Sequence, residues 1–344
     1  MLPKKSALTD YSYRLGHDHQ QRFLAALDQK MIGAGLATAQ DAIFDLDFHA
    51  VMHWGTDPVL EKHYVPTRSQ RSRSVLTFFA QDTGTHNLVY ANADLSKATQ
   101  NREVIAFCDH WRQVSGHDPH LLVMNQKVTT HAVLAELDQR GVKFLTLRMR
   151  STALIRHINT LRPADYKTIT LDRSGHHNRP RVHESSVHLK DYRGSVRQFI
   201  ITGLGRDTPT VLITNDTTST AKQLITRYAR RMTIEQRLAE IIQAFHADAL
   251  SSTVNLNVDL DITLCVLAQA LLAALRARLP GYAGVTPNVL QRRFLETPGQ
   301  IITTQDKITI RLDRRAYTPV LRQTQLPETP VPWWENRTLR YEFA

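Results

Sequence analysis

Three side chains that suit the chemistry of phosphate and metal ions lie at helical spacing in one segment of the chain. Tyr228, Arg231 and Glu235 stand at positions i, i+3 and i+7, so an α-helix places a phenol, a guanidinium and a carboxylate on one face. A carboxylate suits a metal ion, and a guanidinium fork and a hydroxyl suit the phosphate that such an ion binds. The simpler interpretation is a solvated helix face with an ion pair between Arg231 and Glu235.

Two further segments carry polar residues on expected strands. Asp45, Asp47 and His49 alternate with apolar residues, which predicts a strand with its acidic face on the odd numbers. The all-apolar run Leu121–Met124 is typical of a central strand covered on both faces, and it ends at Asn125. Adjacent strands bring their ends together, so these side chains are expected to meet.

The elements that would position these residues follow from the periodicity and the turn signals. The order expected for the first half is β-β-β-α-β-α-β, a mixed sheet flanked by helices. The expected strands are 43–49, 74–80, 88–92, 121–124 and 143–149, then 166–171, 182–189, 196–201 and 210–214, and a hairpin near 301–312. The expected helices are 18–31, 98–114, one ending at 141, a long one over 220–247, then 259–278 and 287–296.

Composition narrows the class of protein. The chain has 344 residues, and its 43 Lys and Arg against 32 Asp and Glu give a net charge of +11, which favours a polyanionic partner such as nucleic acid. Cys108 and Cys265 are isolated in apolar runs, which indicates buried free thiols in a reducing compartment. No apolar segment follows the N-terminal lysines, and the apolar stretch 262–275 is too short to cross a bilayer, so we expect a core helix, no membrane and a cytoplasmic, nucleoid-associated protein.

Together these segments resemble a known family, the bacterial insertion-sequence transposases of the DDE type. The resemblance covers most of residues 40–325, and its motifs are 44–49 (FDLDFH), 121–130 (LLVMNQKVTT), 144–148 (FLTLR), 212–216 (LITND), Tyr-x2-Arg-x3-Glu at 228–235 and 245–252 (FHADALSS). It implies an α/β fold with an RNase H-like mixed sheet flanked by helices, and a β-rich insertion between the second and third catalytic positions. The corresponding division is a helical N-terminal segment over 1–40, a core over 41–158 and 211–280, the insertion over 159–210 and a C-terminal extension over 281–344.

The resemblance also implies roles for individual residues. Asp47 would be the first catalytic acid and Glu235 the third, the two holding Mg²⁺, with Mn²⁺ as the other candidate ion. Tyr228 and Arg231 would contact phosphates at the ends of the element. Water or a 3′-hydroxyl would be the nucleophile. Asp45 lies on the same strand face as Asp47 and is the alternative first acid; its other interpretation is a solvated strand residue.

The chain departs from the family in three places. Asn125 stands where the second catalytic Asp is expected, and an amide has an acceptor oxygen but no charge, so metal binding is expected to be weaker. Ile242 stands where a basic residue usually follows the Glu by seven positions. Only 46 residues precede Asp47, which makes the chain look N-terminally shortened.

Other polar and aromatic residues are weaker candidates. Among the basic clusters, those expected to contact the DNA backbone are Arg68, Arg71, Arg227 and Arg230. A structural role is favoured for His49, His53 and His246, an Asx turn for Asp216, and docking on its own domain for the Trp333-Trp334 pair.

These observations lead to one expected function and two alternatives. The first is a transposase that hydrolyses and joins phosphodiesters of double-stranded DNA, at transposon ends and target, impaired here by Asn125; a homodimer in the DNA complex stays open. The second is a non-catalytic DNA-binding relic that occupies transposon ends. The third is a hydrolase of RNA–DNA hybrids or junctions, which would share the core.

Overall fold

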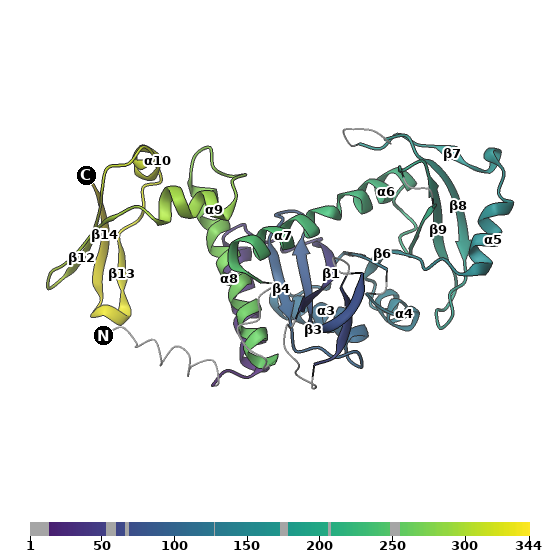
Figure 1. Ribbon diagram of the computed structural model, residues 1–344, viewed down its shortest axis with the longest axis horizontal. Coiled ribbons are helices and arrows are strands. Elements are labelled where there is room, and N and C mark those ends of the chain that lie inside the picture. Colours follow the sequence, from purple (N-terminus) through teal and green to yellow (C-terminus); the bar gives the residue numbers. More distant parts are fainter. Residues whose placement is uncertain are drawn as a thin grey trace. The chain divides into compact units, whose positions relative to one another are not determined.

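The computed structural model describes residues 14–52, 60–65, 69–126, 128–172, 178–205, 208–247 and 255–344. The chain divides into two compact units, Met1–Leu267 and Ala268–Ala344. Each unit has a sheet of its own (Figure 1).

The first unit carries most of the regular structure. Its strands are β1 (Ile43–Met52), β2 (Lys62–Val65), β3 (Gln70–Asp82), β4 (Leu88–Asn92), β5 (Leu121–Met124), β6 (Lys143–Leu147), β7 (Lys167–Thr168), β8 (Arg181–Val187), β9 (Val196–Thr202) and β10 (Thr210–Thr214). Its α-helices are α2 (His17–Gly33), α3 (Glu103–Ser115), α4 (His131–Gln139), α5 (Thr152–Thr160), α6 (Ala221–Arg230) and α7 (Met232–Phe245), and α8 (Asn255–Arg278) continues into the second unit. Short 3₁₀ turns occupy Gln100–Arg102 and Pro163–Asp165.

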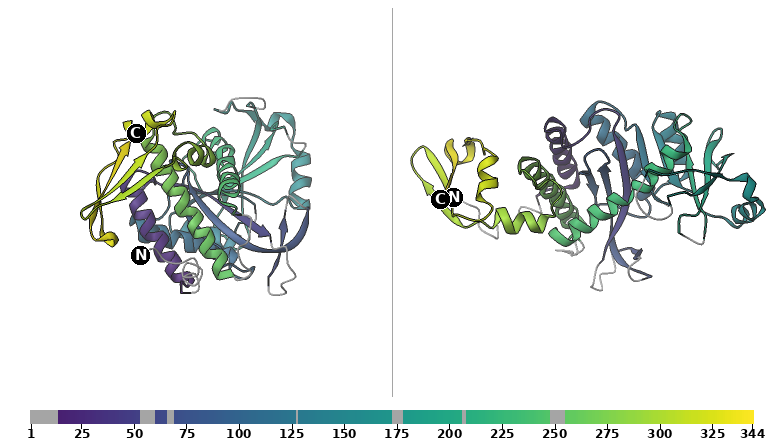
Figure 2. Two further views of the ribbon diagram at one scale, coloured as in Figure 1. Left: turned by 60° about the vertical axis from the view of Figure 1, so that its left-hand side comes forward. Right: turned by 90° about the horizontal axis from the view of Figure 1, so that it is seen from above.

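One mixed sheet runs through the first unit. Its strand order is β2-β3-β1-β5-β6-β10-β9-β8-β7, and β4 also pairs with β3. Within the part β4-β3-β1-β5-β6, β3 pairs antiparallel with both β4 and β1. Strand β5 pairs parallel with both β1 and β6. Helices lie on both faces of this part, as the views from two further directions show (Figure 2). This is the RNase H-like arrangement that the sequence predicted.

The β-rich insertion extends this sheet. Strand β10 pairs antiparallel with β6, and β9, β8 and β7 follow by antiparallel pairing. The same sheet therefore carries both the core and the insertion between Asn125 and Glu235. The apolar residues of β5, β6, β9 and β10 form one buried cluster with α6, which includes Leu145, Phe199, Leu212 and Leu224.

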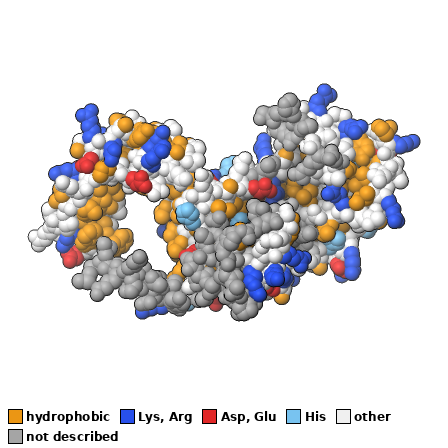
Figure 3. Space-filling model, in the orientation of Figure 1, with side chains coloured by type: hydrophobic (Ala, Val, Ile, Leu, Met, Phe, Trp, Pro, Cys, Tyr) orange, Lys and Arg blue, Asp and Glu red, His pale blue; other side chains and the backbone are white. Residues whose placement is uncertain are grey.

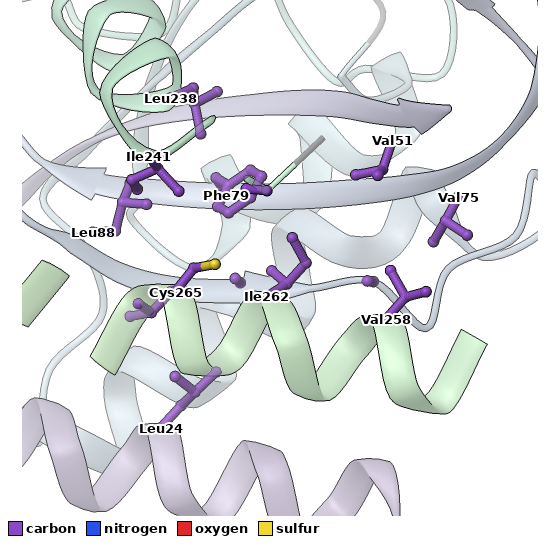
Figure 4. Close-up of a cluster of buried hydrophobic side chains, with 14 of the residues drawn as sticks. Leu24, Val51, Val75, Phe79, Leu88, Leu238, Ile241, Val258, Ile262 and Cys265 are labelled. Carbon is purple, nitrogen blue, oxygen red and sulfur yellow. The ribbon is translucent and has the colours of Figure 1, made fainter. Parts of the chain in front are cut away.

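Side chains on β1 alternate between two covered faces. The even-numbered Phe44 packs against Phe107 and Trp111 of α3, with ring centroids 5.0 and 4.6 Å apart. The odd-numbered Val51 belongs to the cluster on the opposite face, where α2, α7 and α8 converge on β3 and β4 around Phe79 (Figure 4). The acidic face of β1 is therefore also covered, because α7 lies over it.

Several elements differ from those expected. The long helix expected over 220–247 is divided at Arg231, whose N–H donates to Tyr228 O, three residues back, at 3.1 Å. Strand β2 and helix α5 were not expected. Helix α8 begins before the expected Asp259, and Asn257–Arg278 is apolar and long enough to span a membrane by length and composition, unlike the 14 residues considered above. More than half of that stretch is buried, as in the core helix of a globular domain.

The second unit is a smaller α+β structure. Its sheet has the order β11-β12-β14-β13, and its core is a cluster around Leu290, Phe294 and Leu321. Its elements are α9 (Pro287–Leu290), the π-turn Gln291–Leu295, β11 (Gly299–Thr303), β12 (Lys307–Leu312), α10 (Thr318–Gln323), β13 (Thr329–Val331), the turn Pro332–Trp334 and β14 (Arg337–Phe343). Lys and Arg side chains are spread over the visible surface of both units among hydrophobic ones, without one dominant patch (Figure 3).

Candidate functional site

The register of two parallel strands brings the first two expected site residues together. In the pairing of β1 with β5, Leu46 lies opposite Met124. The next residues along the chain are Asp47, within β1, and Asn125, directly after β5, so their side chains lie side by side on the same face of the sheet. Both residues line one groove of about 840 Å³.

A guanidinium bridges the expected first and third acids. Arg231 lies at the junction of α6 and α7 and is 4% exposed. Its Nη2 is 2.9 Å from Asp47 Oδ2, and its Nη1 is 3.0 Å from Glu235 Oε1. The sequence predicted the second of these ion pairs as the simpler interpretation of the helix. The first ion pair joins residues 184 positions apart in the chain. It links the start of α7 to β1 and so brings the site residues together.

Asp45 lies deeper than Asp47. It is 2% exposed, and the Thr233 hydroxyl is 3.4 Å from its Oδ2 and equally far from Gln81 Oε1. Within the described part of the chain, Asp45 Oδ1 has no hydrogen-bond partner. Burial raises the pKa of Asp45 to about 7, against the attraction of Arg231 and Arg227. The interpretation of Asp45 as a solvated strand residue is therefore wrong.

Asp47 is the more accessible of the two acids. Its side chain is 15% exposed, and its Oδ1 accepts a hydrogen bond from the backbone N–H of Phe48 at 3.1 Å. Burial raises the pKa of Asp47, and the charge of Glu235 raises it further, while Arg231 lowers it. Because Asp47 opens to the groove and Asp45 does not line it, the geometry favours Asp47 over Asp45 as the acid that meets a ligand.

Asn125 is oriented by its own neighbour. Its Oδ1 accepts a hydrogen bond from the backbone N–H of Gln126 at 2.8 Å, and its carbonyl accepts one from the Thr146 hydroxyl at 3.2 Å. The amide oxygen therefore keeps only one lone pair for another partner, and it carries no charge.

Two cavities meet at Asn125. The first is the groove that holds Asp47; its basic and titratable lining consists of Lys62, Arg71, Lys97, His49 and His63. The second has a volume of about 370 Å³ and is lined by Tyr228, Arg231 and Glu235 together with apolar residues of the insertion and α6, among them Leu171, Ile201, Leu204 and Ile225. Tyr228, Arg231 and Glu235, expected on one face of one helix, thus border one pocket, although the helix is divided at Arg231.

The residues expected to contact DNA are placed differently from one another. Arg71 lines the groove, and Arg230 is exposed at the end of α6. Arg227 is half-buried, donates to the Thr83 hydroxyl at 3.1 Å and lies near enough to Asp45 to lower its pKa. Arg68 lies outside the described residues. The structure therefore brings Arg227 and Arg71 to the site and leaves Arg230 on the surface.

The weaker candidates have mixed outcomes. Asp216 is 3% exposed and accepts hydrogen bonds from the backbone and hydroxyls of Thr218 and Ser219, which confirms the expected Asx turn. His246 is exposed and ends α7 in a left-handed conformation. Trp333 is 86% exposed and Trp334 41%, so the expected docking of the pair on its own domain is wrong for Trp333. His53 lies outside the described residues.

Position 242, where the family usually has a basic residue, carries an apolar side chain in the groove. Ile242 follows Glu235 by seven residues and lines the groove. The sequence showed no signal for four other residues of the site. Thr233 lies off the expected helix stripe, Gln81 ends a strand with no motif, and Lys62 and Lys97 are 35 positions apart and meet only through the fold.

The side chains do not offer a ligand set for a pair of divalent ions as they are arranged. Among the described residues, no three Asp, Glu, His or Cys side chains are grouped closely enough to hold a metal ion. Asp47 and Glu235 both contact the guanidinium of Arg231, and the Asn125 oxygen is bound to backbone. The carboxylates suit Mg²⁺ in kind, but a cation of the chain already lies between them.

Comparison with known proteins shows the family to which the chain belongs. The family model described as "Transposase DDE domain" matches residues 52–271, which includes Asn125 and Glu235 and begins just after Asp47. No curated protein matches the chain. Among solved structures, a complex of the Marinitoga piezophila Argonaute with 5′ OH guide RNA and target DNA aligns at 11% identity and a TM-score of 0.23, over 67% of this chain and 30% of that one. The chain thus spans about a third of that protein, and so low a score carries no argument. On the family match, which covers more than half of its length, the chain belongs to the DDE transposase domain family.

Proposed function

We propose that this chain is the transposase of an insertion sequence, that it binds double-stranded DNA at the element's ends and at the target, and that its phosphodiester hydrolysis and strand transfer are strongly impaired. The observation that carries the impairment is Asn125. It stands beside Asp47, and its amide oxygen already accepts a hydrogen bond from the backbone N–H of Gln126, so the position supplies no charge and only one further lone pair. Members of the family typically use divalent metal ions, which need hard oxygen ligands.

The charges around the site suit the binding of a phosphodiester backbone. Arg231 and Tyr228 border the smaller pocket, and Arg71, Lys62 and Lys97 line the groove on the other side of Asn125. Basic side chains on both sides of the acids would position backbone phosphates next to Asp47 and Glu235. The net charge of +11 supports the long-range attraction of DNA.

The cleavage defect is tested with a supercoiled plasmid that carries the flanking ends of the element. Purified chain is incubated with the plasmid and Mg²⁺ or Mn²⁺, and the nicked fraction is followed on a gel. We expect the unaltered chain to nick no faster than its Asp47→Asn variant, and Asn125→Asp to nick measurably faster than both. Glu235→Gln in the Asn125→Asp background is the control and should lose the gained activity. Robust nicking by the unaltered chain that Glu235→Gln abolishes would contradict the proposal.

A second candidate function is non-catalytic occupancy of transposon ends. The observation in its favour is the ion-pair bridge itself, because Arg231 neutralises part of the acidic charge without any metal. Binding of end DNA would then be independent of added metal and would fall steeply with salt, since phosphate contacts release counterions. Equal binding with Mg²⁺ and with chelator, together with silence of Asn125→Asp in the nicking assay, would favour this function over the first.

A further inference from the structure

The guanidinium of Arg231 lies where a metal ion bound by both Asp47 and Glu235 would lie. It is nearly buried, and its two terminal nitrogens face the two acids, Asp47 at 2.9 Å and Glu235 at 3.0 Å. The acids come from β1 and from α7, and this fork holds them to one cation. The pair with Asp47 lies in a poorly solvated part of the site, where the attraction between opposite charges is strong, whereas the pair with Glu235 is open to solvent.

We infer that Arg231 is the resident cation of this centre, and that a divalent ion is bound only after the guanidinium has exchanged its carboxylates for a DNA phosphate. This inference rests on the proposed function, because it takes the phosphate to be one of the DNA backbone. It concerns the order of binding and the competition for Asp47 and Glu235, which the family match does not address.

Competition follows from the contacts. A metal ion that binds Asp47 Oδ2 or Glu235 Oε1 must displace the guanidinium nitrogen from that oxygen. A displaced guanidinium left buried without an anion is costly, so displacement by metal alone is unfavourable. The same displacement becomes favourable when a phosphate receives the guanidinium, because Arg pairs with phosphate as well as with carboxylate.

Three features of Arg231 fit such an exchange. Its side chain lines the 370 Å³ pocket together with Tyr228, so a phosphate bound in that pocket would lie next to the guanidinium. Its Nε and Nη2 make no hydrogen bond in the described part of the chain, although Nη2 lies 2.9 Å from Asp47 Oδ2, which leaves donors for an incoming oxygen. The Glu235 side chain is 52% exposed, so that end of the bridge is open to solvent and its ion pair is the weaker of the two.

Linkage then makes the coupling reciprocal. If DNA removes Arg231 from the acids, DNA raises the affinity for metal, and metal raises the affinity for DNA by the same factor. Couplings of this kind usually amount to about 5- to 150-fold in affinity. Removal of the guanidinium should give the same gain in metal affinity without DNA and should abolish the coupling.

The test measures Mn²⁺ binding to the full chain by electron paramagnetic resonance of the free ion, with no cleavage readout. Arg231→Gln keeps a polar side chain of similar length and removes the charge. The matched control is Arg237→Gln, on the same helix, whose Arg donates to His86 O and pairs with Glu240 away from Asp47. We expect Arg231→Gln to bind Mn²⁺ at least about tenfold more tightly than the unaltered chain. Arg237→Gln should leave the affinity unchanged, and Asp47→Asn added to Arg231→Gln should remove the gain.

A second arm needs no variant. Mn²⁺ affinity of the unaltered chain is measured with and without a duplex of the element's end at fixed ionic strength, and we expect an increase of at least about fivefold with DNA. The inference is overturned if the unaltered chain alone binds Mn²⁺ as tightly as Arg231→Gln does, or if bound DNA leaves the Mn²⁺ affinity unchanged. If the chain does not bind the duplex at all, the proposed function fails, while the comparison of Arg231→Gln with the unaltered chain still decides whether the guanidinium excludes the metal.

Discussion

Replacement of Asp45 by Asn should make the stability of the first unit less dependent on pH. Asp45 is 2% exposed, and burial raises its pKa from 3.8 to about 7. The folded chain therefore binds the Asp45 proton more tightly than the unfolded chain does. The stabilisation from this proton is present below about pH 4 and is lost as pH rises through about 7. Between pH 5 and pH 8.5 the loss amounts to roughly 2–3 kcal/mol, at about 1.4 kcal/mol for each unit of pKa difference that is traversed.

The assay is urea unfolding at pH 5 and pH 8.5, followed by the fluorescence of Trp111 in a background in which the other three tryptophans, Trp54, Trp333 and Trp334, are replaced by Phe. This Trp is fully buried and packs on Phe44, one residue from Asp45, so its emission reports the unfolding of the first unit. The quantity compared is the change in unfolding free energy between the two pH values, taken for the unaltered chain and for Asp45→Asn. We expect the unaltered chain to lose roughly 2–3 kcal/mol more than the variant does.

The matched control is Asp191→Asn, the same substitution at an exposed side chain of the first unit, which should leave the pH dependence of the unaltered chain in place. Groups remote from Asp45 that titrate in this range cancel, because they are common to all three proteins. Equal pH dependence for the unaltered chain and Asp45→Asn would refute the reasoning, since it would mean that Asp45 ionises in the folded chain as easily as in the unfolded one.

Three other changes test the packing elsewhere. Gly299→Ala should lower the urea midpoint of the second unit, with a loss of about 1–3 kcal/mol, because the new Cβ would lie 2.3 Å from the backbone oxygen of Arg311. The Cys108 thiol, whose pKa burial raises to about 12, should not react with a thiol reagent at pH 8 until urea unfolds the chain. His110→Leu should cost about 3–5 kcal/mol at pH 8, because it leaves the buried Asp28 carboxylate, 2.8 Å from His110 Nε2, without its partner. That loss should be smaller at pH 5, because burial raises the pKa of Asp28 to about 6 and the carboxyl can protonate there; an equal loss at both pH values would contradict this cause.

Local patterns predicted the elements that carry the site. Alternation along 43–49 gave the strand and the correct parity of Asp45 and Asp47, and the apolar run before Asn125 gave the neighbouring strand. The same kind of pattern gave the strand 210–214 with its bounds. These predictions succeeded because periodicity and burial are set by residues close together in the chain.

What the sequence did not predict depends on contacts between distant residues. The long helix is divided at Arg231, which forms an ion pair with Asp47. No residue within the helix segment predicts this division. The burial of Asp45 comes from α7 lying over the strand, which a two-residue period cannot show. The insertion was expected as a set of strands, but the pairing of β10 with β6, which makes it part of the main sheet, joins residues about 65 positions apart.

Asn125 and the Arg231 bridge belong to the same electrostatic balance. The accessible charges at the centre are those of Asp47, Glu235 and Arg231, which leave one net negative charge for an entering cation. A carboxylate at position 125 would leave two, and the attraction of a divalent ion grows with that number while the repulsion between ion and guanidinium stays the same. Each change alone should therefore recover only part of the metal affinity. The double variant Asn125→Asp, Arg231→Gln should bind Mn²⁺ more tightly than either single variant, because one substitution adds a ligand and the other removes the competitor for the two acids already there.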